Sequence, residues 1–522
     1  MAKRKGEDGM AFERFYDGRV PGYRAPGPAP QEGVRLVPSL TENLIALRAA
    51  GGNTQDLVVR EFCVSGTPAA LVLCEGMFNL TALGQNILGP LAALRLERPD
   101  PRRLLELVRR DLLLAVDQGE VRTLGEVYRF IASGFGVLLI DGVDCGVTLA
   151  LQGFSFRSVA EPSAEVNLRG SREGFTEPLR INMSMIRRRI KSPALRFELL
   201  TLGSCSKTDA FLVYLDGAVS PALLGRVRAD LAGADLDLVL DTGYLQPFLD
   251  RQHPLSFFSG VGTTERPDTA CAKINEGRVV VLLDGTPVAL VVPCLFAEHF
   301  QTFDDYALRP YYALFLRCLK YLAFFTSILL PGVYVAVGTF HPELLPQELL
   351  YNIMASMQTT PYSMMTEALL IHLFYEIMRE AGLRLPRPVG HAVSIAGGLV
   401  VGDVAVKAGL IGTPLVMVVA LTAISAFVVP TLYEPVTVLR FLFILAGGLW
   451  GLPGISLGTA AVLCNLCALT VAQVPVTSPA APLRLYSLRD LVYRQSWLKL
   501  GRRVMEVQQT PGSGQAPGGG GA

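Results

Sequence analysis

The sequence Gly136-Val-Leu-Leu-Ile-Asp-Gly-Val-Asp-Cys-Gly-Val-Thr-Leu-Ala-Leu151 contains two apolar runs on either side of an Asp-Gly pair. This pattern is typical of a β-hairpin, because the tight turn that joins two twisted strands needs residues that accept positive φ. The pattern returns as Gly277-Arg-Val-Val-Val-Leu-Leu-Asp-Gly-Thr-Pro-Val-Ala-Leu-Val-Val292. We therefore expect two hairpins of the same kind.

Each hairpin is preceded by another apolar run that ends in glycine, and this arrangement indicates an internal duplication. The first run is Thr67–Gly76 and the second is Thr208–Gly217, and segments of helical character lie between each run and its hairpin. The two runs end 141 residues apart, and the glycines of the two Asp-Gly pairs are 143 residues apart. The near-equal offsets predict two similar α/β subdomains, residues 34–154 and 177–292, joined by a linker at 155–176.

The charge distribution divides the chain at about residue 310. Residues 1–310 hold 71 charged side chains, whereas the remaining 212 residues hold only 22. A soluble domain carries about 25% charge, so the second part is poor in charge and suited to lipid. This composition argues against a simple soluble enzyme, and a net charge of +1 excludes a strongly basic nucleic-acid binder. Residues 1–33 and 507–522 are rich in Gly and Pro, and we expect them to be disordered.

Residues 293–475 are predicted to form a helical membrane domain with five or six spans. No Lys or Arg occurs in residues 321–378, and no charge of either sign occurs in residues 441–483. Tyr351–Met357 is expected to be a connector on the membrane surface. The last apolar stretch is broken near Gly447–Gly454, so it is either one broken helix or two short spans. The expected spans are 315–338, 361–380, 391–410, 413–433, 437–452 and 455–474.

Basic residues predict the orientation of these spans, because cytoplasmic connections carry an excess of Lys and Arg. If the spans alternate, almost all basic residues of the second part fall on one side, and the opposite connections carry only Lys407. Both termini are therefore predicted to face the cytoplasm. Residues 476–506 are expected to be a basic segment at the membrane interface.

Ionisable residues inside the expected spans are candidates for function, because their burial in lipid is costly. Glu367, His372 and Glu376 lie in the second span, and Asp403 and Lys407 form an i,i+4 pair in the third. Such a pair can also simply neutralise itself near a helix end. Small residues in the third span allow either tight helix packing or a narrow pore, and the sequence does not choose between them. The pore-lining candidates are Gly397, Gly398, Val401, Gly402 and Asp403.

A helix is predicted from about Glu177 to Lys191, with Thr176 as its N-cap. It ends in a run of basic residues, which either form a solvated face or contact anionic lipid or a neighbouring subunit. The candidates for such a subunit or lipid contact are Arg169, Arg172, Glu173, Arg187, Arg188 and Arg189.

The sequence contains two short motifs similar to those of enzymes, but neither has the residues or the context that the enzyme class requires. Ser206-Lys-Thr208 lacks the glycines of a phosphate-binding loop. Gly454-Ile-Ser-Leu-Gly458 lies between membrane spans and not in a strand–turn–helix, although an intramembrane serine protease that pairs Ser456 with His372 remains formally open. The nine cysteines lack metal-type spacing. We therefore expect no enzymatic activity, no catalytic residue, no metal site and no cofactor.

Several longer motifs resemble the GerA family of bacterial spore germination proteins, specifically its A subunits. The likeness covers roughly residues 155–505, with Ser171 and Cys205 as departures. The segments that carry it are Glu161-Pro162, Arg169–Phe175, Arg187–Lys191, Ser206–Asp209, Asp241–Tyr244, Thr264–Asp268, Glu276–Pro287 and Glu380–Pro388.

This resemblance implies a multi-pass protein of the spore inner membrane that forms an oligomeric ion channel within a germinant receptor. It further implies a permease-like B subunit that senses the nutrient and a lipoprotein C subunit as partners, besides copies of the chain itself and membrane lipid, but no nucleic acid. Two alternatives stay open. The chain is either a non-conducting structural or signalling subunit, or an amplifying ion channel similar to the paralogue SpoVAF.

Overall fold

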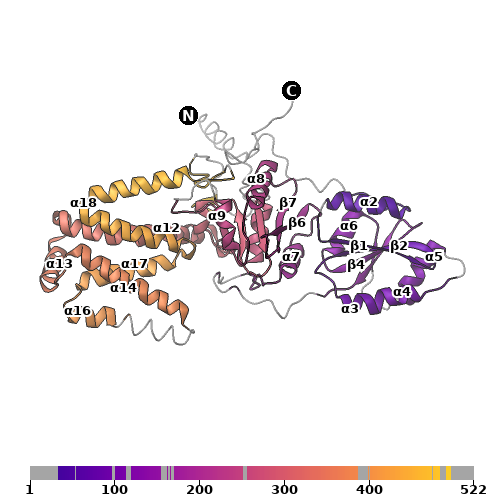
Figure 1. Ribbon diagram of the computed structural model, residues 1–522, viewed down its shortest axis with the longest axis horizontal. Coiled ribbons are helices and arrows are strands. Elements are labelled where there is room, and N and C mark those ends of the chain that lie inside the picture. Colours follow the sequence, from indigo (N-terminus) through magenta and orange to yellow (C-terminus); the bar gives the residue numbers. More distant parts are fainter. Residues whose placement is uncertain are drawn as a thin grey trace, which may run out of the picture.

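The computed structural model shows an elongated protein of three parts, which follow one another along the chain (Figure 1). An N-terminal α/β subdomain lies at one end, a second α/β subdomain lies in the middle, and a helical domain forms the other end. The structure describes residues 33–52, 54–96, 100–112, 119–153, 162, 165, 170–250, 256–385, 398, 400–472, 474–481 and 490–494. The predicted disordered ends, residues 1–32 and 507–522, lie outside these ranges.

The two α/β subdomains contain antiparallel five-stranded sheets with the same strand order, which confirms the prediction of two similar subdomains. The first sheet has the order β1-β2-β4-β5-β3, and the second has the equivalent order β6-β7-β9-β10-β8. The first contains β1 (Leu57–Val64), β2 (Thr67–Cys74), β3 (Glu120–Val121), β4 (Phe135–Ile140) and β5 (Gly146–Ala150). The second contains β6 (Leu195–Leu202), β7 (Thr208–Leu215), β8 (Gly262–Thr264), β9 (Val279–Leu283) and β10 (Ala289–Val292).

Both predicted hairpins are present, as β4–β5 and β9–β10. Leu138 pairs with Val147 in the first hairpin, and Val281 pairs with Leu290 in the second. Gly142 and Gly285 follow the aspartates of the two turns with φ values of 88° and 91°. A positive φ is strained for residues with a side chain, so the Asp-Gly pattern has the expected physical cause.

Helices cover both faces of each sheet, because both faces of the strands are apolar. In the first subdomain, α2 (Leu40–Gly51) and α6 (Leu124–Ile131) pack on one face. The opposite face is covered by α3 (Leu80–Ala82), η1 (Leu83–Leu88), α4 (Gly89–Ala93), α5 (Pro101–Leu107) and η2 (Val108–Leu112). Strand residues alternate between these two cores, as the pleat of a strand requires.

In the second subdomain, α7 (Leu179–Arg187) and α10 (Pro267–Asn275) pack on one face of the sheet. The opposite face packs on α8 (Pro221–Ala232) and α9 (Gln246–Leu249), and the short helix η4 (Thr242–Tyr244) comes just before α9. The core on this second face also contains Phe324 and Phe443 of the helical domain. One continuous apolar core therefore joins the second subdomain to the helical domain.

The first helix of each subdomain is capped by the aspartate of its hairpin turn. The backbone N–H of Leu40 donates to Asp141 Oδ1 at 2.9 Å, and that of Leu179 donates to Asp284 Oδ1 at 3.0 Å. The predicted start of this helix is therefore wrong: α7 begins at Leu179, and Thr176 does not cap it. The N–H of Thr176 instead donates to Asn182 Oδ1. The helix covers Leu179–Arg187 and is therefore shorter than the predicted 177–191.

The helical domain begins with two short helices, η5 (Phe296–Phe300) and α11 (Phe303–Ala307). Two of its helices are long and apolar enough to cross a membrane by length and composition, at Pro310–Phe340 and Pro430–Ala468, and Thr413–Phe427 is a shorter apolar helix. The predicted total of five or six spans therefore stays a prediction. The remaining elements are α12 (Pro310–Phe340), η6 (Pro342–Leu344), α13 (Gln347–Thr359), α14 (Met364–Arg384), η7 (Val400–Val404), α16 (Ala405–Lys407), α17 (Thr413–Phe427), η8 (Pro430–Leu432) and α18 (Tyr433–Ala468).

Helix α18 folds back on itself, which addresses the open question about the last apolar stretch. Gly451 interrupts it with φ 63° and ψ −148°, and Pro453 follows two residues later. A methyl group added to Gly458 would lie 3.1 Å from the ring of Phe443. Fifteen residues of straight helix would separate these positions by about 22 Å, so the two halves of α18 form a helical hairpin.

Residues that follow α18 return to the second subdomain and to the start of α12. The short strands β11 (Thr470–Val471) and β12 (Val474–Pro475) pair with each other, and Val476 accepts a hydrogen bond from the N–H of Phe296. Arg494 is buried and donates to the carbonyl of Leu308 at 2.8 Å. The described part of the predicted interfacial segment therefore packs on protein.

Candidate functional site

The helical domain contains a buried ion pair between Glu376 of α14 and Arg440 of α18. Arg440 is completely buried, and its Nη1 lies 3.1 Å from Glu376 Oε1. The hydroxyl of Tyr433 donates to the same carboxylate at 2.9 Å, and Nε of Arg379 donates to it at the same distance. Glu376 is therefore neutralised on several sides, which lowers the cost of burying a carboxylate.

Arg440 also contacts a third helix, α12, through a backbone carbonyl that a proline leaves free. Nε of Arg440 donates to the carbonyl oxygen of Ser327 at 3.0 Å. In a regular helix this oxygen would accept from the N–H of residue 331, but residue 331 is proline and has no N–H. Arg440 thus satisfies the orphan carbonyl and ties α12 to α14 and α18.

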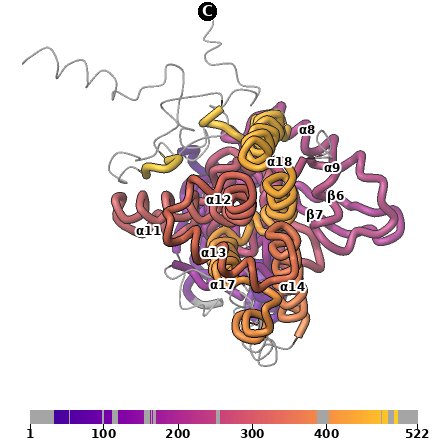
Figure 2. Tube along the Cα trace, turned by 90° about the vertical axis from the view of Figure 1, so that its left-hand side faces the viewer, coloured from indigo at the N-terminus to yellow at the C-terminus, as the bar shows by residue number. Residues whose placement is uncertain are grey.

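Helices α12 and α18 also approach each other closely at two glycines. A methyl group added to Gly332 would lie 2.5 Å from the carbonyl oxygen of Phe443, and one added to Gly447 would overlap the carbonyl oxygen of Gly332. Only glycine allows the two backbones to come this close. Figure 2 shows α12, α14 and α18 together from the far end of the helical domain.

The structure assigns separate surroundings to the other ionisable residues predicted in the second span. Glu367 is buried, and its Oε1 accepts from the N–H of Gly412, which is the N-cap of α17. A carboxylate at this position is favoured by the helix dipole. His372 Nδ1 lies 2.8 Å from the carbonyl of Ala368 in the same helix. Glu367 and Glu376 therefore each join α14 to another helix, whereas His372 bonds within its own helix.

Two of the pore-lining candidates, Gly398 and Gly402, have open space beside them. Among the described residues, no atom lies within 4 Å of a methyl group added to either glycine. Asp403 and Lys407 form their predicted pair at 2.7 Å, with side chains 53% and 74% exposed. Gly397 lies outside the described residues, and the side-chain surroundings of Val401 also lie outside them. The described small residues thus leave one face of this segment open.

A second polar cluster holds the start of α12 against the C-terminal segment. Nε of Arg317 lies 3.1 Å from Asp305 Oδ2, and its Nη1 lies 3.0 Å from Asp490 Oδ1. Lys320 adds an ion pair to Asp305 at 3.3 Å, and Nη1 of Arg494 donates to the carbonyl of Asp305 at 2.6 Å. This cluster fixes α12 at the boundary with the second subdomain.

Charged groups continue beneath the second sheet, next to this boundary. Arg278 is completely buried and forms ion pairs with Glu276 and Glu298, and Lys273 lies 3.0 Å from Glu298. Burial alone would raise the pKa of Glu298, but the charges of Arg278 and Lys273 outweigh it and lower that pKa to about 2. A cavity of about 420 Å³ adjoins this network, lined in part by Lys273, Glu298, His299, Lys320 and Thr431.

The predicted contact arginines lie at the junction of the two α/β subdomains. Nε of Arg187 lies 2.5 Å from Asp56 of the first subdomain, and both side chains are buried. Arg188 and Arg189 both pair with Glu173 and are partly buried. Arg172 is described, whereas Arg169 lies outside the described residues. All three arginines of the basic run therefore pair with carboxylates of the same chain, and the partner of Arg187 belongs to the other subdomain.

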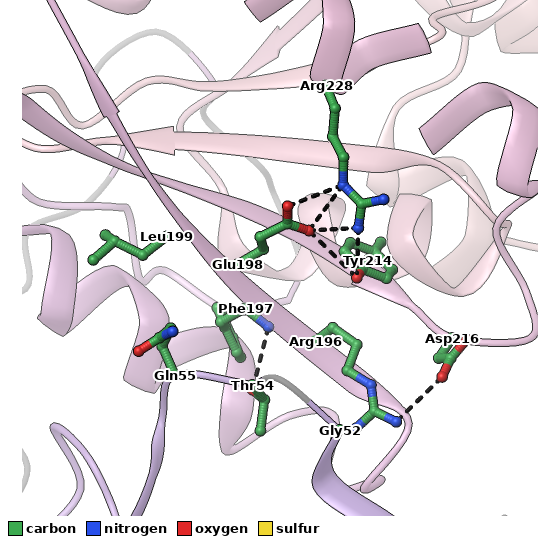
Figure 3. Close-up of a pocket in the computed structure, with 10 residues that line it drawn as sticks. All are labelled: Gly52, Thr54, Gln55, Arg196, Phe197, Glu198, Leu199, Tyr214, Asp216 and Arg228. Carbon is green, nitrogen blue, oxygen red and sulfur yellow. Dashed lines mark hydrogen bonds and ion pairs between the residues drawn. The ribbon is translucent and has the colours of Figure 1, made fainter. Parts of the chain in front are cut away.

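A polar cleft of about 580 Å³ also lies at this junction (Figure 3). The N–H of Phe197 donates to Thr54 Oγ1 at 3.3 Å across it. Arg228 binds the carboxylate of Glu198, with its Nη2 2.6 Å from Oε2. In the described part of the chain, no group of His, Cys, Asp and Glu side chains is arranged to hold a metal ion.

Comparison with known proteins identifies the family. Residues 46–505 match the family described as "Bacillus/Clostridium GerA spore germination protein". The chain belongs to the GerA spore germination family. The match extends beyond the region in which the sequence motifs were found, since it includes most of the first α/β subdomain.

Several members of the GerA family resemble the chain over most of its length. Spore germination protein KA of Bacillus subtilis (strain 168) is 35% identical over 469 residues, which are 89% of this chain and 86% of that protein. Spore germination protein GerLA of Bacillus cereus is 32% identical over 454 residues, which are 86% and 92% of the two chains. The crystal structure of the N-terminal domain of the A subunit of the Bacillus megaterium spore germinant receptor GerK3 is 28% identical and covers 50% of this chain and 97% of that chain, with a TM-score of 0.40.

Sequence reasoning missed the residues that join distant parts of this GerA chain. Arg440 is one of the basic residues that predict the orientation of the spans, and neither it nor Ser327 nor Tyr433 is among the predicted site residues. Pro331 inside an apolar helix was the available signal, because a proline there leaves the carbonyl four residues earlier without its donor.

Proposed function

We propose that the chain is the A subunit of a spore germinant receptor and forms an oligomeric ion channel in the spore inner membrane. In this proposal the channel opens when a permease-like B subunit senses a nutrient, and a lipoprotein C subunit completes the receptor. Membership of the GerA family supports the receptor assignment. The chain would act without catalysis.

The observation that carries the channel proposal is the open face of small residues around Gly398 and Gly402. In a helical membrane domain, small residues without internal neighbours are suited to contact other copies or to line a narrow pore. One chain has too few spans to enclose a pore, so several copies around a symmetry axis are required. The proposed pore lining is Gly397, Gly398, Val401, Gly402 and Asp403.

The internal pairing of charges favours a second candidate, a non-conducting signalling subunit. Glu376, Arg440 and Arg317 all find partners inside one chain, as expected of groups that transmit movement between helices without contacting ions. In that case the ions pass elsewhere in the receptor. An amplifying channel similar to SpoVAF would share the pore and differ in its partner.

Two measurements on the full chain test the proposal. Native mass spectrometry of the detergent-solubilised protein is expected to give an oligomer larger than a dimer, whereas a monomer or dimer would contradict a self-formed pore. Spores that carry Val401→Ala are expected to leak ions before nutrient is added, because a smaller side chain widens an apolar constriction. Ion release identical to that of wild-type spores would favour the signalling subunit.

A further inference from the structure

The connection between β10 and α12, residues 293–309, contains the short helix η5, which contacts both the second α/β subdomain and the helical domain. On the side of the second subdomain, Glu298 of η5 is buried and lies 3.0 Å from Nζ of Lys273 in α10. The guanidinium of Arg278, one residue before β9, binds the same carboxylate. Two cations therefore hold η5 against the second subdomain.

The two residues that follow Glu298 contact the helical domain instead. Nδ1 of His299 lies 3.1 Å from Oγ1 of Thr431 in η8, the short turn that leads directly into α18. Phe300 stacks on the ring of Tyr321 in α12, with the two ring centroids 4.0 Å apart. Three consecutive residues of η5 thus contact the second subdomain, the start of α18 and α12 in turn.

The contact at Thr431 continues into the centre of the helical domain. Two residues later, the hydroxyl of Tyr433 donates to Glu376, and Glu376 pairs with Arg440. Arg440 in turn bonds the carbonyl oxygen of Ser327. A series of ion pairs and hydrogen bonds therefore runs from the second subdomain, through η5, to the place where α12, α14 and α18 meet.

The contact between His299 and Thr431 lies beside a cavity. Both residues line the cavity of about 420 Å³ at the boundary between the second subdomain and the helical domain. Protein interiors are close-packed, and voids larger than a water molecule are few. A cavity of this size gives η5 and η8 room to shift against each other without a clash, as an element with two arrangements requires.

We propose that η5 is a coupling element, which passes movements of the second α/β subdomain to α18 through the contact between His299 and Thr431. These two are positioning residues, because they set the place of the first turn of α18. Such coupling requires an element that both parts of the chain bias, and η5 is bonded to both. The coupling rests on contacts within one chain, whereas its use in opening a channel rests on the proposed function.

Hydrogen exchange of the full chain in detergent tests the coupling, and the first two turns of α18, Tyr433–Arg440, are the region that reports it. Lys273→Gln weakens the anchor of η5 and is expected to raise exchange there about threefold. Thr431→Val removes the hydroxyl that His299 contacts and is expected to raise exchange by a similar factor. In the double variant, Lys273→Gln should add nothing further, because the contact that transmits its effect is already lost.

Arg228→Gln is the matched control, since Arg228 belongs to the same subdomain and binds a different glutamate, Glu198. It should leave exchange in α18 at the wild-type level. Equal effects of Arg228→Gln and Lys273→Gln would overturn the proposal, as would a Lys273→Gln effect that is the same with and without Thr431→Val. His299→Phe keeps an aromatic ring without the hydrogen bond, and it should reproduce Thr431→Val if that variant does not fold.

Spores separate a failure of the coupling from a failure of the proposed channel. Thr431→Val spores are expected to respond to nutrient more slowly than wild-type spores, while native mass spectrometry gives the wild-type oligomer. A wild-type nutrient response would overturn the role of the coupling in opening. Ion conduction by the purified chain is measured without the nutrient, so its absence would contradict the channel and leave the exchange result unaffected.

Discussion

The carbonyl oxygen of Ser327 accepts a hydrogen bond from Nε of Arg440 at 3.0 Å, 113 residues away in the sequence. Pro331 creates the vacancy on this oxygen, and the same guanidinium also neutralises Glu376. One side chain thus connects three helices of the helical domain. We expect the stability of the helical domain to depend on Arg440 more than on any exposed cation.

Arg440→Ala is predicted to lower the free energy of unfolding by about 3–5 kcal/mol, because it leaves Glu376 buried without its nearest buried cation. Thermal unfolding of the detergent-solubilised chain measures the effect. Lys407→Ala, which breaks an exposed ion pair, is the control and should cost less than about 1 kcal/mol. The double variant Glu376→Gln with Arg440→Gln should lose less stability than the two single variants together, and strictly additive losses would argue against a direct pair.

Gly332→Ala and Gly447→Ala are each predicted to destabilise the chain by about 1–3 kcal/mol, because the added methyl group meets the backbone of the facing helix. Gly225→Ala is a suitable comparison, since Gly225 lies on an exposed face of α8 and no described residue comes within 4 Å of an added methyl group. That change should stabilise by up to about 1 kcal/mol, because alanine favours a helix. Equal unfolding temperatures for all three variants would contradict the close approach of α12 and α18.

Asp141→Ala and Asp284→Ala are predicted to cost similar amounts, about 0.5–2 kcal/mol each, since each aspartate caps the first helix of its own subdomain. Asp284→Asn keeps an acceptor oxygen and should retain most of the stability. Chemical unfolding monitored by circular dichroism provides the measurement. A large loss at one position and none at the other would show that the two caps are not equivalent.

Glu165 is predicted to make stability depend on pH. Burial raises the pKa of Glu165 to about 6, despite a hydrogen bond from Thr264 at 2.8 Å and the charge of Arg266. Between its ordinary value of 4.5 and about 6, the folded chain keeps a proton that the unfolded chain has released. The free energy of unfolding therefore falls as the pH rises through this window.

The Glu165→Gln variant should lack this part of the pH dependence. Its stability should therefore fall less between pH 5 and pH 7 than that of the wild type. Unfolding temperatures at the two pH values give the comparison. Glu177→Gln, at an exposed position, should leave the wild-type dependence in place. A Glu165→Gln profile parallel to that of the wild type would contradict the role of Glu165.

The features that could be predicted from the sequence are those with local causes. The Asp-Gly hairpins follow from turn chemistry, and the break near Gly451 follows from glycine and proline in an apolar run. The equal strand orders follow because the same local pattern occurs twice. The start of α7 was misplaced because its cap, Asp284, lies 105 residues away.

Partners of buried charges could not be predicted, because they are set by packing between distant segments. In the sequence, Arg187 is one of several cations in a basic run. Its partner, Asp56, lies in the other subdomain, 131 residues away. Likewise Glu376 was singled out for its burial, but the sequence did not indicate that Arg440 neutralises it. Membrane burial predicts that a partner exists without saying which residue it is.

The most direct test of the central proposal is potassium efflux from liposomes that contain only the purified chain. We predict that liposomes with the Val401→Ala chain release potassium well above the level of empty liposomes. Liposomes with the wild-type chain should release little, because no partner subunit is present to open the channel. Leu457→Ala, on the exposed surface of the second half of α18, should behave like the wild type. Absence of efflux from every chain at high protein density would contradict a channel formed by this subunit.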